Sequence, residues 1–284
     1  YMKHLIYSAV LLLVMTTGCE KNDGPTSSTD PIDREIVLTP IITKVVKAPQ
    51  LNEDGSGTFN EGDTFTLYAY DDAKGSSAID YTLGLTTLLW RDLDFVEEGK
   101  TVNFVACYPP QVLDGDRFDF TVGQNSASDL LLASAVQAHV GEEQPVVLTF
   151  RHAMHRLVVN FTIKDSSIGA ESIKTRCTAY SSCEVRLTTG SLTRGEEKET
   201  YSMDGPEATF LLLPQATQDV VLEVEVGKIS KRWALAALDP SYENLEPGKE
   251  LKVNLTITSE NILFSGMTIE GWGDQGTITG DIII

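Results

Sequence analysis

Two small groups of side chains are the first candidates for metal chemistry. His152 and His155 lie three residues apart, and on a strand this spacing puts two imidazoles on opposite faces, where they cannot share a metal ion. We therefore expect packing or surface roles for both histidines. Asp114, Asp116 and Asp119 offer oxygen ligands suited to calcium, but their loop lacks the ligand order of an EF-hand. No metal site is predicted from either group.

A third group copies the end of a phosphate-binding loop. Gly99, Lys100 and Thr101 match the last positions of that motif, but Asp94 stands where its leading glycine is required. A strand is expected after Thr101, whereas the motif needs a helix, so these residues are predicted to form a turn. Neither H-E-x-x-H nor G-x-S-x-G occurs in the sequence. We predict no catalytic residue and no cofactor.

The cysteines are the remaining reactive side chains. Cys107 lies within an apolar strand pattern and is expected to pack as a small hydrophobic residue. Cys177 and Cys183 are six residues apart around an expected turn, and in an exported protein they could form a disulfide across a hairpin. Spacing alone does not fix the distance between their Cα atoms, so paired and free thiols both remain open.

The fourth cysteine, Cys19, follows a segment typical of bacterial lipoprotein signal peptides. Lys3 precedes an apolar run from Leu5 to Met15, and small residues lead from there to the cysteine. A spanning helix needs roughly 20 apolar residues, more than this run provides. Residues 1–18 are therefore predicted to be removed, which leaves a lipidated Cys19 at the surface of the outer membrane. The alternative is an ordinary secretory signal cut nearby, which also exports the protein.

Composition describes an acidic globular chain. The sequence has 284 residues, with 41 Asp and Glu against 22 Lys and Arg, and a formal net charge of -19. Such a surface repels nucleic acid, so no nucleic-acid partner is expected. Hydrophobic residues make up 42%, which is normal for a protein with a substantial core.

The periodicity of the sequence indicates β structure after a polar lead-in. Residues 19–34 are rich in Pro, Ser and Thr, so a flexible tether is expected there. Residues 157–164 and 251–258 alternate apolar and polar side chains, the period of a strand with one buried face. Turn-forming residues separate such stretches. The sequence therefore predicts an all-β fold made of β-sandwiches.

The length of the chain favours two sandwiches in succession. We place an N-terminal β-sandwich domain at residues 35–166 and a C-terminal one at residues 167–284. The only plausible helix lies near residues 128–139. Phe161 is placed on the buried face of a strand in the core of the first domain, and Asn160 on its wet face.

Short sequence blocks, in a fixed order along nearly the whole mature chain, suggest a family. They are FNEGD at 59–63, TFTLYAY at 64–70, Trp90, VNFVACYP at 102–109, Gln124 before SDLLLA at 128–133, LTFRHAMHRL at 148–157, FLLLPQ at 210–215, LEPGKEL at 245–251 and IEGW at 269–272. Together they resemble the fimbrillin family, the subunits of type V pili of Bacteroides-type bacteria. The acidic residues after Cys19 resemble the export tag of surface-exposed lipoproteins of that phylum.

This resemblance implies two tandem transthyretin-like β-sandwich domains and a structural, adhesive subunit of a fimbrium (pilus), without enzymatic activity. It also implies polymerisation with other fimbrial subunits, identical or different, through exchange of β-strands. The outer membrane, reached by the lipid anchor, and host or bacterial surface ligands are the other partners that it suggests.

The resemblance also directs attention to proteolytic processing. The strands removed before assembly are expected at residues 35–39 and 42–46. In the family an arginine commonly follows the second strand, where an arginine-specific protease cuts, but this chain has Lys47 there. Arg34 precedes both strands, and a cut after it would free the lipid yet leave the strands in place. Arg34 and Lys47 are both candidate processing sites, and an unprocessed anchor subunit remains open.

The C-terminal residues are strongly apolar, with isoleucine at 278 and at 282–284. Ile278, Ile282, Ile283 and Ile284 are expected to be buried, because exposed apolar ends favour aggregation. They could form a final strand within the C-terminal domain. They could instead form a donor strand that fills the groove of a neighbouring subunit.

Two other functions compete with the fimbrial interpretation. A surface β-sandwich lipoprotein that binds glycans would need exposed aromatic side chains, for which Tyr180, Tyr201 and Tyr242 are candidates. A secreted hydrolase would need a cleft with paired carboxylates, and among 41 acidic residues some pair will occur by chance. The fimbrial subunit is our preferred interpretation, and glycan binding is the first alternative.

Overall fold

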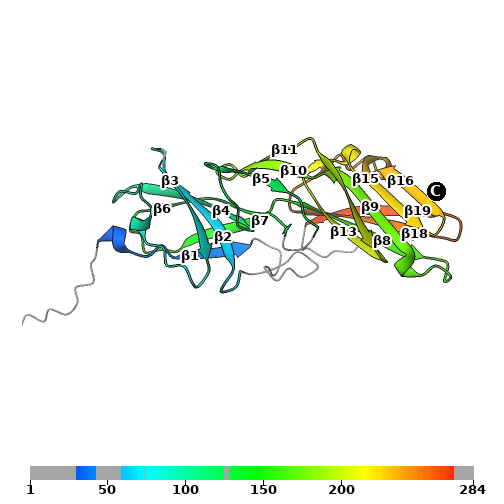
Figure 1. Ribbon diagram of the computed structural model, residues 1–284, viewed down its shortest axis with the longest axis horizontal. Helices are drawn as coiled ribbons and strands as arrows, with labels where there is room; N and C mark the ends of the chain where they lie inside the picture. Colours follow the sequence, from blue (N-terminus) through cyan, green and yellow to red (C-terminus); the bar gives the residue numbers. More distant parts are fainter. Residues whose placement is uncertain (1–29, 43–58, 74, 125–127, 272–284) are drawn as a thin grey trace, which may run out of the picture.

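The computed structural model describes residues 30–42, 59–73, 75–124 and 128–271. The molecule is elongated and consists almost entirely of β-strands arranged in layers (Figure 1). Within these ranges no helix is both long enough and apolar enough to cross a membrane. Cys19, Lys47 and the four C-terminal isoleucines lie outside the described residues.

A six-stranded sheet, which contains the first described strand, forms one part of the molecule. Its strand order is β1-β7-β6-β4-β2-β3. β1 runs parallel to β7, and all other neighbours are antiparallel. The strands are β1 (Leu38–Ile42), β2 (Thr64–Tyr70), β3 (Ser76–Thr82), β4 (Thr101–Tyr108), β6 (Leu131–His139) and β7 (Val146–His152).

Two of the inner strands of this sheet, β2 and β4, are buried on both faces. On β2, Phe65 and Leu67 pack into one core while Tyr68 packs into another. On β4, Val105 and Cys107 face the same core as Tyr68. A strand buried on both faces carries a nearly continuous apolar run, which is the pattern seen in both strands. The prediction that Cys107 packs as a small hydrophobic residue is confirmed.

Different elements cover the two faces of the six-stranded sheet. One face is covered by a three-stranded sheet of order β11-β10-β5. These strands are β5 (Arg117–Thr121), β10 (Ser182–Arg186) and β11 (Ser191–Arg194). The other face is covered by the stretch that contains the short helix η2 (Trp90–Asp92), from which Leu88, Trp90 and Leu93 are buried.

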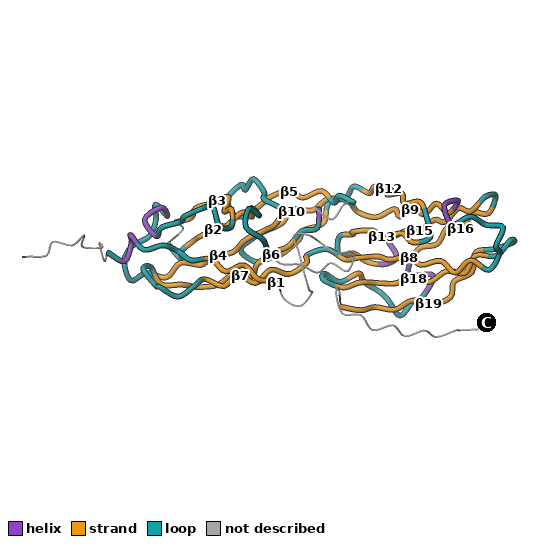
Figure 2. Tube along the Cα trace, turned by 90° about the horizontal axis from the view of Figure 1, so that it is seen from below, coloured by secondary structure: helices purple, strands orange, loops and turns teal. Residues whose placement is uncertain are grey.

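Two four-stranded sheets make up the other part of the molecule and appear as two layers in Figure 2. The first has the order β12-β9-β15-β16 and the second the order β13-β8-β18-β19. Apolar side chains from both sheets meet in one core, including the fully buried Leu157, Cys177 and Val253. The strands are β8 (His155–Ile163), β9 (Ile173–Tyr180), β12 (Lys198–Asp204), β13 (Glu207–Leu212), β15 (Val221–Val226), β16 (Ile229–Ala234), β18 (Lys249–Ile257) and β19 (Ile262–Gly271).

Short elements connect these layers. A two-stranded ribbon pairs β14 with β17. The only α-helix in the described residues is a single turn after β16. The connecting elements are η1 (Pro31–Asp33), η4 (Ala170–Ser172), η5 (Thr217–Asp219), α1 (Leu235–Leu238), β14 (Gln215–Ala216) and β17 (Asn244–Leu245).

The all-β, sandwich-like prediction is confirmed, but the predicted helix near residues 128–139 is wrong. This stretch forms β6, which pairs along its length with β4 and at its start with β7. Its leucine and alanine residues favour a helix, but helix propensity is only a weak local preference. Pairing between two buried neighbours in a sheet outweighs that local preference, because it satisfies the main chain and buries Leu131 and Ala133.

The strand pairing does not follow the predicted boundary between residues 166 and 167. β8 precedes that boundary but pairs with β13 and β18, which follow it. β10 follows the boundary but pairs with β5, which precedes it. The division into two tandem domains stays a prediction, and each half of the sequence contributes strands to sheets of the other.

The register predicted for β8 agrees with the structure, but its place in the fold does not. Leu157 and Val159 are fully buried, Phe161 packs partly buried against the same core, and Asn160 faces the other side. This core belongs to the paired four-stranded sheets and not to the six-stranded sheet. Phe161 is therefore not a core residue of the first predicted domain, because β8 hydrogen-bonds with β13 and β18.

Candidate functional site: the N-terminal strand

The first described residues, 30–42, form a continuous segment that we call the N-terminal strap. It begins with η1, whose first turn is capped by the Asp30 carboxylate accepting the Ile32 N–H at 3.2 Å. Pro31 occupies the first helical position, where its missing N–H costs nothing. The chain then becomes extended and enters β1 at Leu38.

The strap has a buried face and an exposed face. Ile36 and Leu38 are 1% and 5% exposed, whereas Val37 and Ile41 are 45% and 43% exposed. This alternation is the period of a strand that packs on one side only. Pro40 is tolerated because β1 lies at the edge of its sheet, where one row of N–H groups has no ladder partner to lose.

Main-chain hydrogen bonds hold the strap from two sides. On one side β1 pairs in parallel with β7, from Leu38 opposite Val146 onward, and the Val146 N–H donates to the Val37 carbonyl at 2.8 Å. On the other side the Ile36 N–H donates to the carbonyl of Leu88 at 2.7 Å.

The second side extends two residues further towards the N terminus. The Trp90 N–H donates to the Arg34 carbonyl at 3.1 Å, and Glu35 forms an antiparallel bridge with Leu89. The strap is therefore held by β7 along β1 and by the chain that leads into η2 along residues 34–36, although β1 itself lies at a sheet edge.

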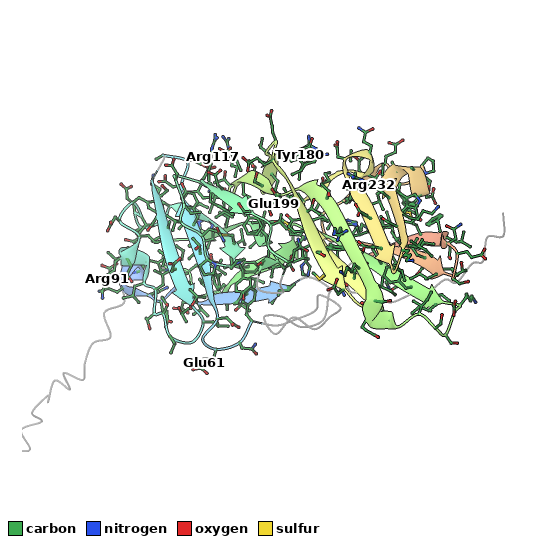
Figure 3. The ribbon with its side chains drawn as sticks, turned by 45° about the vertical axis from the view of Figure 1, so that its right-hand side comes forward. Glu61, Arg91, Arg117, Tyr180, Glu199 and Arg232 are labelled. Carbon is green, nitrogen blue, oxygen red and sulfur yellow. The ribbon has the colours of Figure 1, made fainter. Side chains whose placement is uncertain are left out.

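Side chains add further contacts at the start of the strap. The Arg34 guanidinium donates to the Gly141 carbonyl at 2.7 Å and lies 3.4 Å from a carboxylate oxygen of Glu143. Asp33 pairs with Arg91, which lies at the same end of the molecule (Figure 3). Gly141 has a φ of 82°, and a Cβ there would meet Pro31 at 2.2 Å, so only glycine allows this approach.

The position of this strand refines the sequence prediction. Strands were expected at residues 35–39 and 42–46, and the structure has one strand over Leu38–Ile42 that overlaps both. Residues 43–46 and Lys47 lie outside the described residues. Arg34 lies within the strap, where a flexible tether over residues 19–34 was expected; residues 30–34 are ordered by the contacts of η1 and Arg34.

The two histidines are both buried, but they do not lie on one strand. His152 ends β7 and its Nδ1 contacts the carboxylate of Asp129. His155 begins β8, and its Nδ1–H donates to the Glu246 carbonyl at 2.9 Å. Burial raises the pKa of Asp129 above its ordinary value, while the contact with His152 lowers it in part. Each side chain therefore links the end of one strand to the residues that lead into a neighbouring strand of the same sheet.

The other suggested metal and phosphate sites have structural roles. Asp114 and Arg117 form an antiparallel bridge, and Asp116 accepts a hydrogen bond from Thr188. Within the described ranges no group of His, Cys, Asp and Glu is arranged to hold a metal ion. Gly99 has a φ of 75° and lies in a turn immediately before β4, as predicted for that sequence.

The suggested disulfide between Cys177 and Cys183 is not formed. All three described cysteines are free and buried. Cys177 packs between the two four-stranded sheets, whereas Cys183 packs between the three-stranded and six-stranded sheets. The expected hairpin does not exist because β9 pairs with β12 and β15 while β10 pairs with β5 and β11.

The three tyrosines considered for glycan binding do not form an aromatic surface. Arg194 lies over the ring of Tyr180 at 3.6 Å and Lys198 at 4.4 Å from its centroid. Tyr201 is only 8% exposed, and the Tyr242 hydroxyl donates to the Met267 carbonyl at 3.3 Å. These rings are therefore already engaged in contacts within the chain.

Sequence reasoning missed how the strap is inserted. Nothing in the pattern indicates that Leu88 and Trp90 pair with it or that Gly141 receives Pro31. The only available signal is Asp30-Pro31, a common start for a helical turn. Contacts between residues so distant in sequence depend on tertiary structure, which a local pattern does not encode.

The protein is a layered β structure whose first described strand, β1, packs at the edge of the six-stranded sheet. The sequence profile of the fimbrillin-like family matches residues 47–272. This match covers most of the chain, and the protein belongs to the fimbrillin-like family. No curated protein matches the sequence.

Solved structures from three Bacteroides species share this fold. A candidate cell adhesion protein of Bacteroides uniformis is 16% identical with a TM-score of 0.63, over 86% of this chain and 100% of that one. A candidate cell adhesion protein of Bacteroides ovatus is 18% identical with a TM-score of 0.61, over 86% and 99%. A third, from Bacteroides thetaiotaomicron, is 16% identical with a TM-score of 0.52, over 88% and 99%.

Proposed function

We propose that this protein is a structural and adhesive fimbrial subunit, exported as a lipoprotein through Cys19 and assembled with other fimbrial subunits by β-strand exchange. Membership of the fimbrillin-like family supports the fimbrial role. The observation that carries the assembly mechanism is β1, an edge strand that precedes the rest of the sheet in sequence and contributes buried side chains to its core. The work is mechanical and adhesive, without catalysis.

The strap has the chemistry of an exchangeable strand. Its main chain pairs in register with β7, and its inward side chains fill a core whose other walls come from distant parts of the chain. Ile36 and Leu38 alone contribute roughly 3–6 kcal/mol at 1.5–3 kcal/mol each, as an upper estimate. A strand from a neighbouring subunit with apolar residues at alternate positions would offer the same contacts.

The proposed donor is the C-terminal segment of another subunit. In an extended strand, Ile278, Ile282 and Ile284 share one face, and Ile283 lies on the other. Three apolar residues on one face of a strand suit a groove that accepts every second side chain. A cut after Lys47 would release β1 from its own subunit and open that groove.

Deleting residues 277–284 tests the donor role. We expect a folded monomer that no longer extends fibres when surface material is viewed by electron microscopy. A synthetic peptide of residues 277–284 should bind a chain that lacks residues 19–47. Unfolding of the truncated chain, or no peptide binding, would contradict the donor role.

A matched pair of substitutions tests the face of the donor strand. Ile282→Asn places a polar group on the face that enters the groove, so fibres should shorten strongly. Ile283→Asn changes the adjacent residue on the opposite face and should leave fibre length nearly unchanged. Equal effects of both substitutions would show that strand register does not matter at this segment.

Lipid attachment is tested separately. Cys19→Ser should move the protein from the membrane fraction to the soluble exported fraction, because the acyl chains supply the membrane affinity. Unchanged membrane partitioning would remove the lipoprotein assignment. The N-terminal sequence of the protein recovered from cells would show whether processing occurs at Arg34, at Lys47 or at neither.

A further inference from the structure

We infer that Arg34 is a structural latch, and that the peptide bond between Arg34 and Glu35 is protected from proteases while the strap is in place. This protection is a property of the folded chain alone. For the proposed function, this protection restricts proteolytic processing. The strap, together with any lipid on Cys19, stays joined to the subunit unless the chain is cut at another site. This consequence for processing rests on the proposed function.

The main chain around the Arg34–Glu35 bond is already paired. A protease binds its substrate as an extended strand through main-chain hydrogen bonds, so these groups must be free. Here the Arg34 carbonyl accepts the Trp90 N–H, and the Ile36 N–H donates to Leu88. Susceptibility to cleavage follows such pairing and burial, and not position in the sequence.

The arginine side chain is also engaged. An arginine-specific protease must take the guanidinium into its own specificity site. In the folded chain that group donates to the Gly141 carbonyl at 2.7 Å and lies 3.4 Å from Glu143. The packing of Pro31 against Gly141 holds the preceding turn in place, which restricts the chain on the other side of Arg34.

Cleavage after Arg34 therefore requires local opening of the strap. When opening and closing are fast, the cleavage rate follows the population of the open form. Ile36 sets that population because its side chain is 1% exposed and lies two residues after the scissile bond. Val37, the next residue, points outward at 45% exposure and should have little influence.

The test measures cleavage after Arg34 by an arginine-specific endoproteinase in the purified full chain. A synthetic peptide of residues 30–42 gives the rate for the same bond without the fold. Mass spectrometry follows the fragment that begins at Glu35. We expect the folded chain to be cut at least about 100-fold more slowly than the peptide, since cleavage requires the open form.

Two adjacent substitutions supply the matched comparison. Ile36→Ala should accelerate cleavage roughly 30-fold, because it removes buried side-chain carbons that hold the strap closed. Val37→Ala should change the rate by less than about threefold, since surface substitutions rarely alter stability much. Each rate is divided by that of a peptide with the same substitution, which removes the effect of the residue on the protease itself.

Cleavage after Arg176, in β9 at the other part of the molecule, reports on global unfolding. In Ile36→Ala the acceleration should appear at Arg34 and not at Arg176. Wild-type cleavage within threefold of the peptide rate would overturn the inference, and so would equal effects of the two substitutions. The comparison of cleavage rates between the wild-type chain and the peptide remains a valid test even if a variant does not fold. If Arg34 is protected but the chain builds no fibres, the proposed function is contradicted and the inference about Arg34 is not.

Discussion

His155 is a buried titratable side chain whose protonation acts directly on stability. Burial lowers its pKa to about 4 from 6.5, although the hydrogen bond to Glu246 raises it in part. Within the described residues its Nε2 atom has no hydrogen-bond partner, so protonation would bury an unpaired N–H. A depressed pKa means that stability is present above pH 6.5 and is lost as pH falls towards 4.

We predict that His155→Asn flattens the pH dependence of unfolding. Between pH 7 and pH 4.5 the wild-type chain should lose about 2 kcal/mol more than this variant, whose amide can still donate to the Glu246 carbonyl. Urea denaturation at the two pH values measures the difference. His139→Asn is the control, because it replaces a histidine that is exposed at the surface.

The buried thiols give a second prediction at this scale. Burial raises the pKa of Cys107, Cys177 and Cys183 to about 12, so the thiolate form is nearly absent at neutral pH. In a chain carrying Cys19→Ser, a thiol reagent should label none of the three while the protein is folded and all three in urea. Only one labelled thiol in urea without reductant would indicate a disulfide between the other two.

The strand β8 shows how burial ranks substitutions within one element. Leu157→Ala should cost roughly 2–5 kcal/mol, because Leu157 is fully buried. Phe161→Ala should cost less than the ~3–5 kcal/mol of a fully buried Phe, because Phe161 is only partly buried. Asn160→Ala should cost about 1 kcal/mol through its hydrogen bond to Asn254. Thermal unfolding would reveal the order, and equal losses would contradict the register.

Elements with clear alternation were the ones that sequence could predict. From Leu251 to Ile257, β18 alternates buried and half-buried side chains, so its period of two shows which residues are buried. In β8 the same period places Leu157 and Val159 in the core, but Val158 on the opposite face is buried as well. β6 failed because its run of small residues has no strong period, and its strand form depends on β4 and β7. The candidate site was placed only roughly, because the sequence predicts strands near it but the pairing of residues 34–36 with Leu88 and Trp90 depends on tertiary structure.

At the scale of the whole molecule, shared elements join the two parts of the fold. β10, from the second half of the sequence, pairs with both β5 and β11, and Leu211 and Leu213 complete a core that β2 and β4 line. Gln124 adds a two-way contact, because its side-chain amide donates to the Leu211 carbonyl at 2.9 Å and accepts the Leu211 N–H at 3.1 Å. Neither part is complete without the other.

We therefore predict that the chain unfolds in one cooperative transition. Calorimetric and van't Hoff enthalpies should agree, as they do for two-state unfolding. Residues 30–166 and 167–271 expressed separately should each fail to fold, because the first would expose β8 and leave β5 without β10. Co-expression of the two fragments is the control, since it restores every strand pairing and should recover a folded complex. Two well-separated thermal transitions, together with a folded fragment 30–166, would instead show that the sequence boundary at residue 166 divides independent units and that the shared three-stranded sheet contributes little.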